Sequence, residues 1–259
     1  MIYVLNWLDN IWLGVECMKT EAYGVIQEQF SIITEKSHDR LLMTYDESLE
    51  KNLGTIVIYY PKVIIDTLPN VMIMAGCHGD EIAGPYGCLR ATEYDGLNKK
   101  ANITWIPIVS STAFTRCSRY NQWGENSNEL DVNANISREN ICLLSIFDRF
   151  QGWARDGFLS LHEDLDVHGC YAYVFGSKKD EKIRQIFEGV PILEDGMIGY
   201  DRIESGLIWN IYDESWEARL FQNGSRRSVC FETPGQLPLD DRINFTVGVI
   251  ERYLDIVKN

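Results

Sequence analysis

The sequence contains few residues of several kinds, and each shortage narrows what the protein can be. Histidine occurs only four times, as His38, His78, His162 and His168, so a metal site built from imidazoles has few candidate ligands. Seven cysteines are present, but their number is odd and none forms a CxxC pair. This pattern argues against a disulfide framework and for a reducing compartment, so we expect a cytoplasmic protein whose cysteines are small buried side chains.

Basic residues and long apolar runs are also scarce. The 24 Lys and Arg face 38 Asp and Glu, giving a formal net charge of -14, and such a surface repels phosphate backbones. No apolar run approaches the roughly 18 residues that a membrane span needs. The apolar N-terminal segment has no early Lys or Arg and is interrupted by Asp9 and Glu16. We therefore expect no nucleic-acid partner, no membrane partner and no secretory signal, and we treat residues 1–20 as an atypical N-terminal extension.

The organisation of the chain predicts a single catalytic domain over residues 1–259. There is no internal repeat, low-complexity tract or Pro/Ser-rich linker, and 45% of the residues are hydrophobic. Apolar runs rich in β-branched residues alternate with segments of helical spacing, which predicts an α/β, three-layer sandwich with a central mixed, largely parallel sheet. We expect strands at residues 55–60, 71–75, 103–109, 158–161, 171–175 and 228–231, and helices at 81–94, 139–155, 180–189 and 239–257. The long Asn-rich segment 110–137 is expected to be a functional loop.

A candidate metal site follows two of the predicted strands. His78 comes directly after a strand, between Gly76 and Gly79, and Glu81 lies three residues further on. In a turn that leads into a helix, this spacing can place an imidazole nitrogen and a carboxylate oxygen on one side. His162 follows another predicted strand and supplies a third ligand. Two His and one Glu, with a fourth position open, form a catalytic zinc arrangement; the alternative is that the histidines are strand-end residues satisfied by local hydrogen bonds.

Five short segments between about residues 70 and 235 occur in a recognisable order. They are His78-Gly-Asp-Glu81, a segment with Phe114, Arg119 and Asn121, then Asp131-Val132-Asn133-Ala134, the strand-end His162, and Glu232 in Phe-Glu-Thr-Pro. In order and spacing they resemble the motifs of the zinc metallocarboxypeptidase superfamily. That superfamily is typified by carboxypeptidase A and includes the succinylglutamate desuccinylase and aspartoacylase branch. The resemblance implies the same fold.

The resemblance implies a role for each matching residue. His78, Glu81 and His162 would hold one Zn²⁺ per chain, and Glu232 would accept the proton of the attacking water and deliver it to the leaving nitrogen. The others would bind substrate or orient ligands. Arg119 would bind substrate and stabilise the oxyanion, Asn133 would bind the substrate's terminal carboxylate, and Asp131 would accept a hydrogen bond from the ring of His78.

The sequence departs from the family pattern at Ala134 and before Phe114, where Ser110, Ser111 and Ala113 replace the usual residues. Ala134 stands where the family has an arginine that clamps the substrate's terminal carboxylate, and five arginines are conceivable replacements: Arg116, Arg202, Arg219, Arg226 and Arg227. Glu163 and Asp164 are unusual neighbours of His162. They could recognise an amino group, add a metal ligand, or simply be solvated at a strand end. His168 is expected to be a turn residue, and Tyr212 corresponds only loosely to the family's mobile tyrosine.

Three functions follow from these observations. The first is a cytoplasmic zinc metallopeptidase of carboxypeptidase type that acts on a small or C-terminal substrate. The second is an acyl-amino-acid amidohydrolase, with a small acyl-amino acid as the substrate. The third is a non-catalytic zinc-binding protein on the same fold; Glu232 argues against it, since such a protein has no need of a proton-transfer carboxylate. The oligomeric state is left open.

Overall fold

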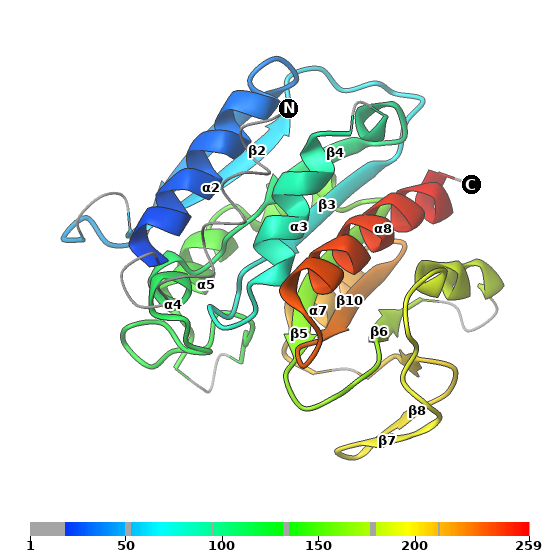
Figure 1. Ribbon diagram of the computed structural model, residues 1–259. Coiled ribbons are helices and arrows are strands. Elements are labelled where there is room, and N and C mark those ends of the chain that lie inside the picture. Colours follow the sequence, from blue (N-terminus) through cyan, green and yellow to red (C-terminus); the bar gives the residue numbers. More distant parts are fainter. Residues whose placement is uncertain are drawn as a thin grey trace.

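The computed structural model describes residues 19–49, 53–94, 96–131, 135–176, 180–211 and 213–258 (Figure 1). Eight strands form one sheet in the order β1-β2-β4-β3-β5-β10-β6-β9. Strands β4, β3, β5 and β10 are parallel, whereas β2 and β6 join this central group in the antiparallel direction. The strands are β1 His38–Thr44, β2 Thr55–Pro61, β3 Asn70–Ala75, β4 Asn102–Ile106, β5 Gly157–Asp164, β6 Tyr171–Phe175, β9 Leu207–Trp209 and β10 Ser228–Pro234. The predicted mixed, largely parallel sheet is confirmed.

Helices cover both faces of the sheet and make the three layers. One layer contains α2 (Lys19–Thr34), α3 (Ala83–Thr92) and α8 (Leu239–Lys258), which lie side by side in front of the sheet in Figure 1. The other contains α5 (Arg138–Leu144), α6 (Phe147–Trp153) and α7 (Trp216–Gln222). Side chains of β3 alternate between the two cores: Ile73 packs with the first layer and Met72 with the second. None of the described helices is long and apolar enough to cross a membrane.

Several elements differ from the prediction. The expected helix at 139–155 is two helices, because the backbone leaves helical geometry at Ile146, where φ is -121°. The predicted loop at 110–137 contains a short helix, α4 (Ser111–Arg116), whose first turn is capped by the Ser110 hydroxyl. The helix expected at 180–189 is a 3-10 helix, η4 (Glu181–Phe187). Elements that were not predicted are α2, β1, β9, α7, the 3-10 turn η3 (Leu97–Lys99) and the hairpin of β7 (Gly196–Ile198) and β8 (Asp201–Ile203).

The candidate site lies at the carboxyl ends of three parallel strands. His78 follows β3, which pairs with β5, and β5 pairs with β10. Glu232 of β10 stands directly opposite His162 of β5 in the register. These two residues lie inside their strands rather than beyond them, because β5 continues to Asp164 and β10 to Pro234. Chemistry in α/β sheets gathers at this edge.

Candidate metal centre and active site

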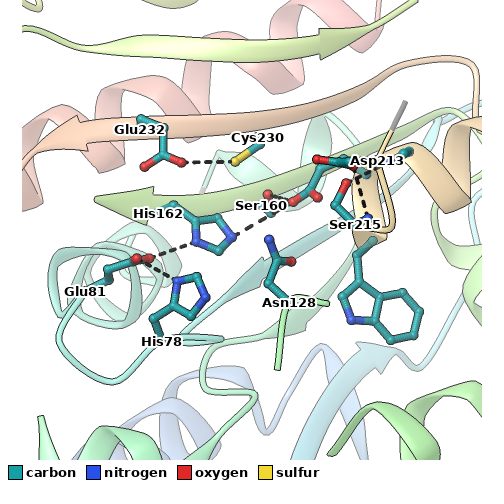
Figure 2. A network of polar contacts seen from close by, with 12 residues as sticks. His78, Glu81, Asn128, Ser160, His162, Asp213, Ser215, Cys230 and Glu232 are labelled. Atoms are coloured by element: carbon teal, nitrogen blue, oxygen red, sulfur yellow. Dashed lines mark hydrogen bonds and ion pairs between the residues drawn. The ribbon is translucent and has the colours of Figure 1, made fainter. Parts of the chain in front are cut away.

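The structure brings His78, Glu81 and His162 together in one buried cluster. His78 Nδ1 lies 2.6 Å from one carboxylate oxygen of Glu81, and His162 Nδ1 lies 2.8 Å from the other (Figure 2). Two glycines shape the loop that carries His78. Gly76 has a φ of 64°, a region that favours glycine, and the Gly79 amide donates a hydrogen bond to the Ser118 carbonyl at 2.8 Å.

The donor atoms of this cluster fit a zinc ion. One atom from each of the three side chains lies within 4.8 Å of the others, and all three side chains are buried. Two imidazole nitrogens and a carboxylate are the donor set of a catalytic zinc site with an open position. Both Nδ1 atoms face the carboxylate, so an ion between them would replace the present contacts between nitrogen and oxygen.

The charges in the cluster hold a proton in the place that a metal would take. Burial opposes a charge on His162, but the neighbouring Glu81 outweighs it and raises the pKa of His162 to about 9. Burial also opposes the charge on Glu81. The attraction and hydrogen bonds of the two imidazoles outweigh this effect, so the pKa of Glu81 lies well below its usual range. His162 is therefore protonated at neutral pH while no metal is bound.

Glu217 is a neighbour of the cluster that the sequence did not reveal. It lies in the first turn of α7, is 1% exposed, and accepts a hydrogen bond from the Ser160 hydroxyl. Its Oε1 is 4.0 Å from His162 Nε2, and that nitrogen is buried without a hydrogen-bond partner among the described residues. When Nδ1 of a histidine binds a metal, the other ring nitrogen carries the proton and usually donates it to a carboxylate or carbonyl. Glu217 is the carboxylate in position to receive it.

The ring of His78 is oriented by a side-chain amide. Asn126 Oδ1 lies 3.0 Å from His78 Nε2. Asn126 belongs to the Asn-rich loop, and its side chain also accepts a hydrogen bond from the amide of Asn128. Asp131, the residue expected in this role, is half-buried in the same loop and does not line the cavity described next. Its role remains a prediction.

A cavity of about 460 Å³ opens over the cluster, and Glu232 and Arg119 line it together with the three candidate ligands. Burial raises the pKa of Glu232 to about 8, even though the charge of His162 opposes the change. The thiol of Cys230 lies 3.5 Å from Glu232 Oε1. Arg119 reaches in from the segment after α4, and its Nη1 lies 3.2 Å from Glu81 Oε1. Half of the Arg119 side chain is exposed, so it can turn towards a bound molecule.

Several other expectations have a structural answer. Arg119 is the single Lys or Arg among the described residues that line the cavity, so the cavity contains none of the five arginines considered as replacements at Ala134. Asn133, Ala134 and Tyr212 lie outside the described residues, as does most of the N-terminal extension. His168 is exposed in a bend and does not line the cavity.

Glu163 and Asp164 have different surroundings. Glu163 is not solvated: it accepts a hydrogen bond from the Ala83 amide at 2.7 Å and forms an ion pair with Arg242, which ties β5 to the start of α3 and to α8. Asp164 lines the cavity and accepts a hydrogen bond from the Tyr171 hydroxyl at 2.9 Å.

Comparison with known proteins identifies the family. Residues 67–139 match the family model of the succinylglutamate desuccinylase/aspartoacylase catalytic domain. The solved structure of a candidate metallopeptidase from Shewanella amazonensis is 30% identical, with a TM-score of 0.82 over 92% of this chain and 94% of that chain. The chain belongs to the metallocarboxypeptidase superfamily. A candidate metallopeptidase from Shewanella baltica is 29% identical, with a TM-score of 0.79 over 91% of each chain.

More distant members of the superfamily share the fold. A metallo-carboxypeptidase from Pseudomonas aeruginosa is 14% identical, with a TM-score of 0.68 over 92% of this chain and 69% of that chain. No curated protein matches the chain. The family is one of metal-dependent hydrolases, which agrees with the cluster of His78, Glu81 and His162 at the sheet edge.

Proposed function

We propose that this metallocarboxypeptidase-superfamily member is a zinc-dependent hydrolase of an amide or peptide bond, of the carboxypeptidase type, acting on a small or C-terminal substrate in the cytoplasm. One observation carries the proposal. The Nδ1 atoms of His78 and His162 converge on the Glu81 carboxylate, and Glu232 stands opposite His162 in the adjacent strand and lines the same cavity. The six described cysteines are free, as a reducing compartment requires.

The residues of the site divide the work of hydrolysis. Zinc held by His78, Glu81 and His162 would supply a Lewis acid that polarises the scissile carbonyl and acidifies water. Glu232 accepts the proton of the attacking water and returns it to the leaving nitrogen. A carboxylate with a pKa raised towards neutrality suits both halves of that transfer, and burial gives Glu232 such a pKa. The positive charge of the metal would lower this pKa and favour the base form.

Arg119 is the group that can stabilise negative charge on the substrate. Its guanidinium lies beside Glu81 at the cavity wall, where the carbonyl oxygen of a substrate bound over the cluster would develop charge. A cation at that point lowers the barrier because the interaction strengthens as the charge forms. Asn133 and Asp131 keep the roles expected from the family resemblance, binding a substrate carboxylate and orienting His78.

A second candidate is an acyl-amino-acid amidohydrolase. The matched family model covers the segment that carries His78, Glu81, Arg119 and Asp131, and it describes a desuccinylase/aspartoacylase domain. The same machinery cleaves the amide of an acyl-amino acid, so the two candidates differ in substrate rather than in chemistry. A non-catalytic zinc protein is less well supported, because Glu232 is buried at a cost in free energy that metal binding alone does not require.

The test combines metal analysis with hydrolysis assays on a panel of peptides and acyl-amino acids. We expect about one zinc per chain, activity that a chelator abolishes and zinc restores, and a Glu232→Gln variant that keeps zinc but loses about 10²- to 10⁴-fold in kcat. Glu28→Gln, at an exposed position of α2, is the matched control and should behave as wild type. A protein that binds no zinc, or a Glu232→Gln variant with unchanged activity, would contradict the proposal.

A further inference from the structure

The cavity over the candidate metal centre is strongly acidic. Eight of its described lining residues are Asp or Glu, whereas Arg119 is the only Lys or Arg among them: Asp80, Glu81, Glu163, Asp164, Asp166, Asp213, Glu217 and Glu232. Four of the eight already have partners or tasks. Glu81 faces the two histidines, Glu232 is the proposed proton carrier, Glu163 pairs with Arg242, and Glu217 accepts the Ser160 hydroxyl.

The other four carboxylates have no cationic partner among the described residues. Asp80, Asp164, Asp166 and Asp213 form no ion pair with any Lys or Arg in the described part of the chain. Asp80 and Asp164 are half-buried, and Asp166 and Asp213 stand at the exposed rim. One oxygen of Asp80 is buried without any hydrogen-bond partner. A buried carboxylate oxygen without a hydrogen bond raises the free energy of the folded protein unless a bound group pairs with it.

Some half-buried carboxylates elsewhere in the described chain are paired: Asp46 lies 3.2 Å from Arg138, and Asp180 pairs with Arg227. Exposed carboxylates without an ion pair are common in so acidic a chain. What sets the four apart is their place, because all of them line a single cavity together with Glu81, Glu217 and Glu232, where a bound molecule can supply positive charge.

An aromatic wall faces the same space. Tyr171, Tyr173 and Phe175 occupy alternate positions of β6, so their side chains leave one face of the sheet, and all three line the cavity. The rings of Tyr171 and Tyr173 are 5.8 Å apart. Burial raises the pKa of the Tyr173 phenol, and the negative charge of Glu232 raises it further. Aromatic faces with carboxylates beside them bind ammonium and guanidinium groups.

We propose that the substrate carries a cationic side chain, an ammonium or guanidinium group next to the scissile amide, which the Tyr171–Phe175 wall and Asp164 and Asp213 receive. This inference rests on the proposed hydrolase function and names its substrate class. A substrate with an anionic side chain would meet like charge at Asp164 and Asp213, and only the metal and Arg119 would attract it.

The test uses two sets of three N-acetylated tripeptides. In the first set the last residue is Lys, norleucine or Glu, and in the second set one of these three residues stands directly before the last amide bond. Binding and turnover are measured separately for each peptide. Binding is measured by calorimetry on the zinc-loaded Glu232→Gln protein, which leaves the peptides intact, and kcat/KM on the wild type. For one of the two positions, the Lys peptide should bind at least about tenfold more tightly than its norleucine match, with Glu weakest, and the advantage should shrink as salt is raised.

Variants locate the effect in the cavity. Asp164→Asn and Asp213→Asn should each bring the Lys-to-norleucine binding ratio towards one, whereas Asp148→Asn, which makes the same charge change at an exposed position of α6, should leave it unchanged. Equal binding of Lys and norleucine peptides, tighter binding of Glu peptides, or no Lys-peptide binding would overturn the inference. Preferred binding of Lys without hydrolysis of any peptide would support it and contradict the hydrolase function instead.

Discussion

At the scale of single residues, the account depends on how the two histidine rings are held. Glu217 is the carboxylate nearest to His162 Nε2, at 4.0 Å, and it is almost fully buried. Replacing it by Gln removes the negative charge that favours a proton on Nε2 and a free lone pair on Nδ1. We expect Glu217→Gln to weaken zinc binding by about 10- to 100-fold, measured by competition with a chromophoric chelator. Cobalt-loaded protein should show a changed visible spectrum, and unchanged affinity would exclude this role for Glu217.

A second residue-scale prediction concerns protons. The pKa of His162 is about 9 in the metal-free site, because the attraction of Glu81 outweighs burial, so the ring is charged at pH 7. Metal binding needs the unprotonated Nδ1 and must therefore displace that proton. Calorimetry of zinc binding in buffers of different ionisation enthalpy should detect release of about one to two protons per zinc at pH 7, one from His162 and up to one from Glu232 as the metal lowers its pKa, and fewer as the pH rises through 9. A binding reaction with no proton release at pH 7 would contradict this charge state.

The sequence predicts the four central residues of the site but not the residues that orient the two histidine rings. His78, Glu81, His162 and Glu232 each stand at or near a strand end in a motif of fixed order, so the local pattern could identify them. Glu217 lies 55 residues after His162, and only the packing of α7 against β5 brings it near. Sequence spacing carries no signal for that contact. Asn126 stands among several asparagines of one loop, and nothing in the sequence distinguishes it from the others.

At the scale of elements, the loop after β3 requires a glycine at position 79. A Cβ atom on Gly79 would collide with the backbone of Ala113 in α4, and backbone cannot move aside as a side chain can. Gly79→Ala should therefore destabilise the fold and displace His78, lowering both the unfolding midpoint and zinc affinity. Gly152→Ala in α6 is the matched control. A Cβ there meets no atom within 4 Å, so this variant should be neutral or more stable by up to about 1 kcal/mol.

The first strand contains a buried histidine that should make stability depend on pH. His38 Nε2 donates to the Ile103 carbonyl at 3.0 Å, and burial lowers the pKa of the ring. In the unfolded chain His38 takes up a proton near pH 6.5, whereas in the folded protein it does so only at a lower pH. His38 therefore stabilises the fold above pH 6.5, and this stabilisation is lost as the pH falls below that value towards the lowered pKa of the folded state. Denaturant unfolding between pH 7.5 and 5.5 should show a steeper loss for wild type than for His38→Gln. Equal slopes would contradict the assignment.

The elements that the sequence predicts are those with strong apolar patterns. Central strands such as β3, with the sequence NVMIMA, are buried on both faces and stand out as apolar runs. The edge strand β1, HDRLLMT, has only half-buried or exposed positions after His38 and is half polar, and β9 has only three residues. The strands β1 and β9 form because they pair with a neighbouring strand, and their own sequences carry no clear apolar pattern.

At the scale of the whole molecule, the order of the strands along the sequence differs from their order across the sheet. β10 is the last strand along the chain, yet it lies beside β5 at the centre of the sheet, and this pairing places Glu232 opposite His162. The family motifs predict that meeting, whereas hydrophobic periodicity does not. The net charge of -14 likewise predicts no nucleic-acid partner, but it does not show that carboxylates gather at the cavity.

The most direct test of the central claim is a crystal of the zinc-loaded protein with diffraction data collected on both sides of the zinc absorption edge. We predict a single strong anomalous peak per chain at the carboxyl ends of β3 and β5, within about 2.0 to 2.3 Å of His78 Nδ1, Glu81 and His162 Nδ1. Glu232 should remain outside the coordination sphere. A peak elsewhere, or no peak with the three side chains still in contact with one another, would contradict the claim that they form a catalytic metal centre.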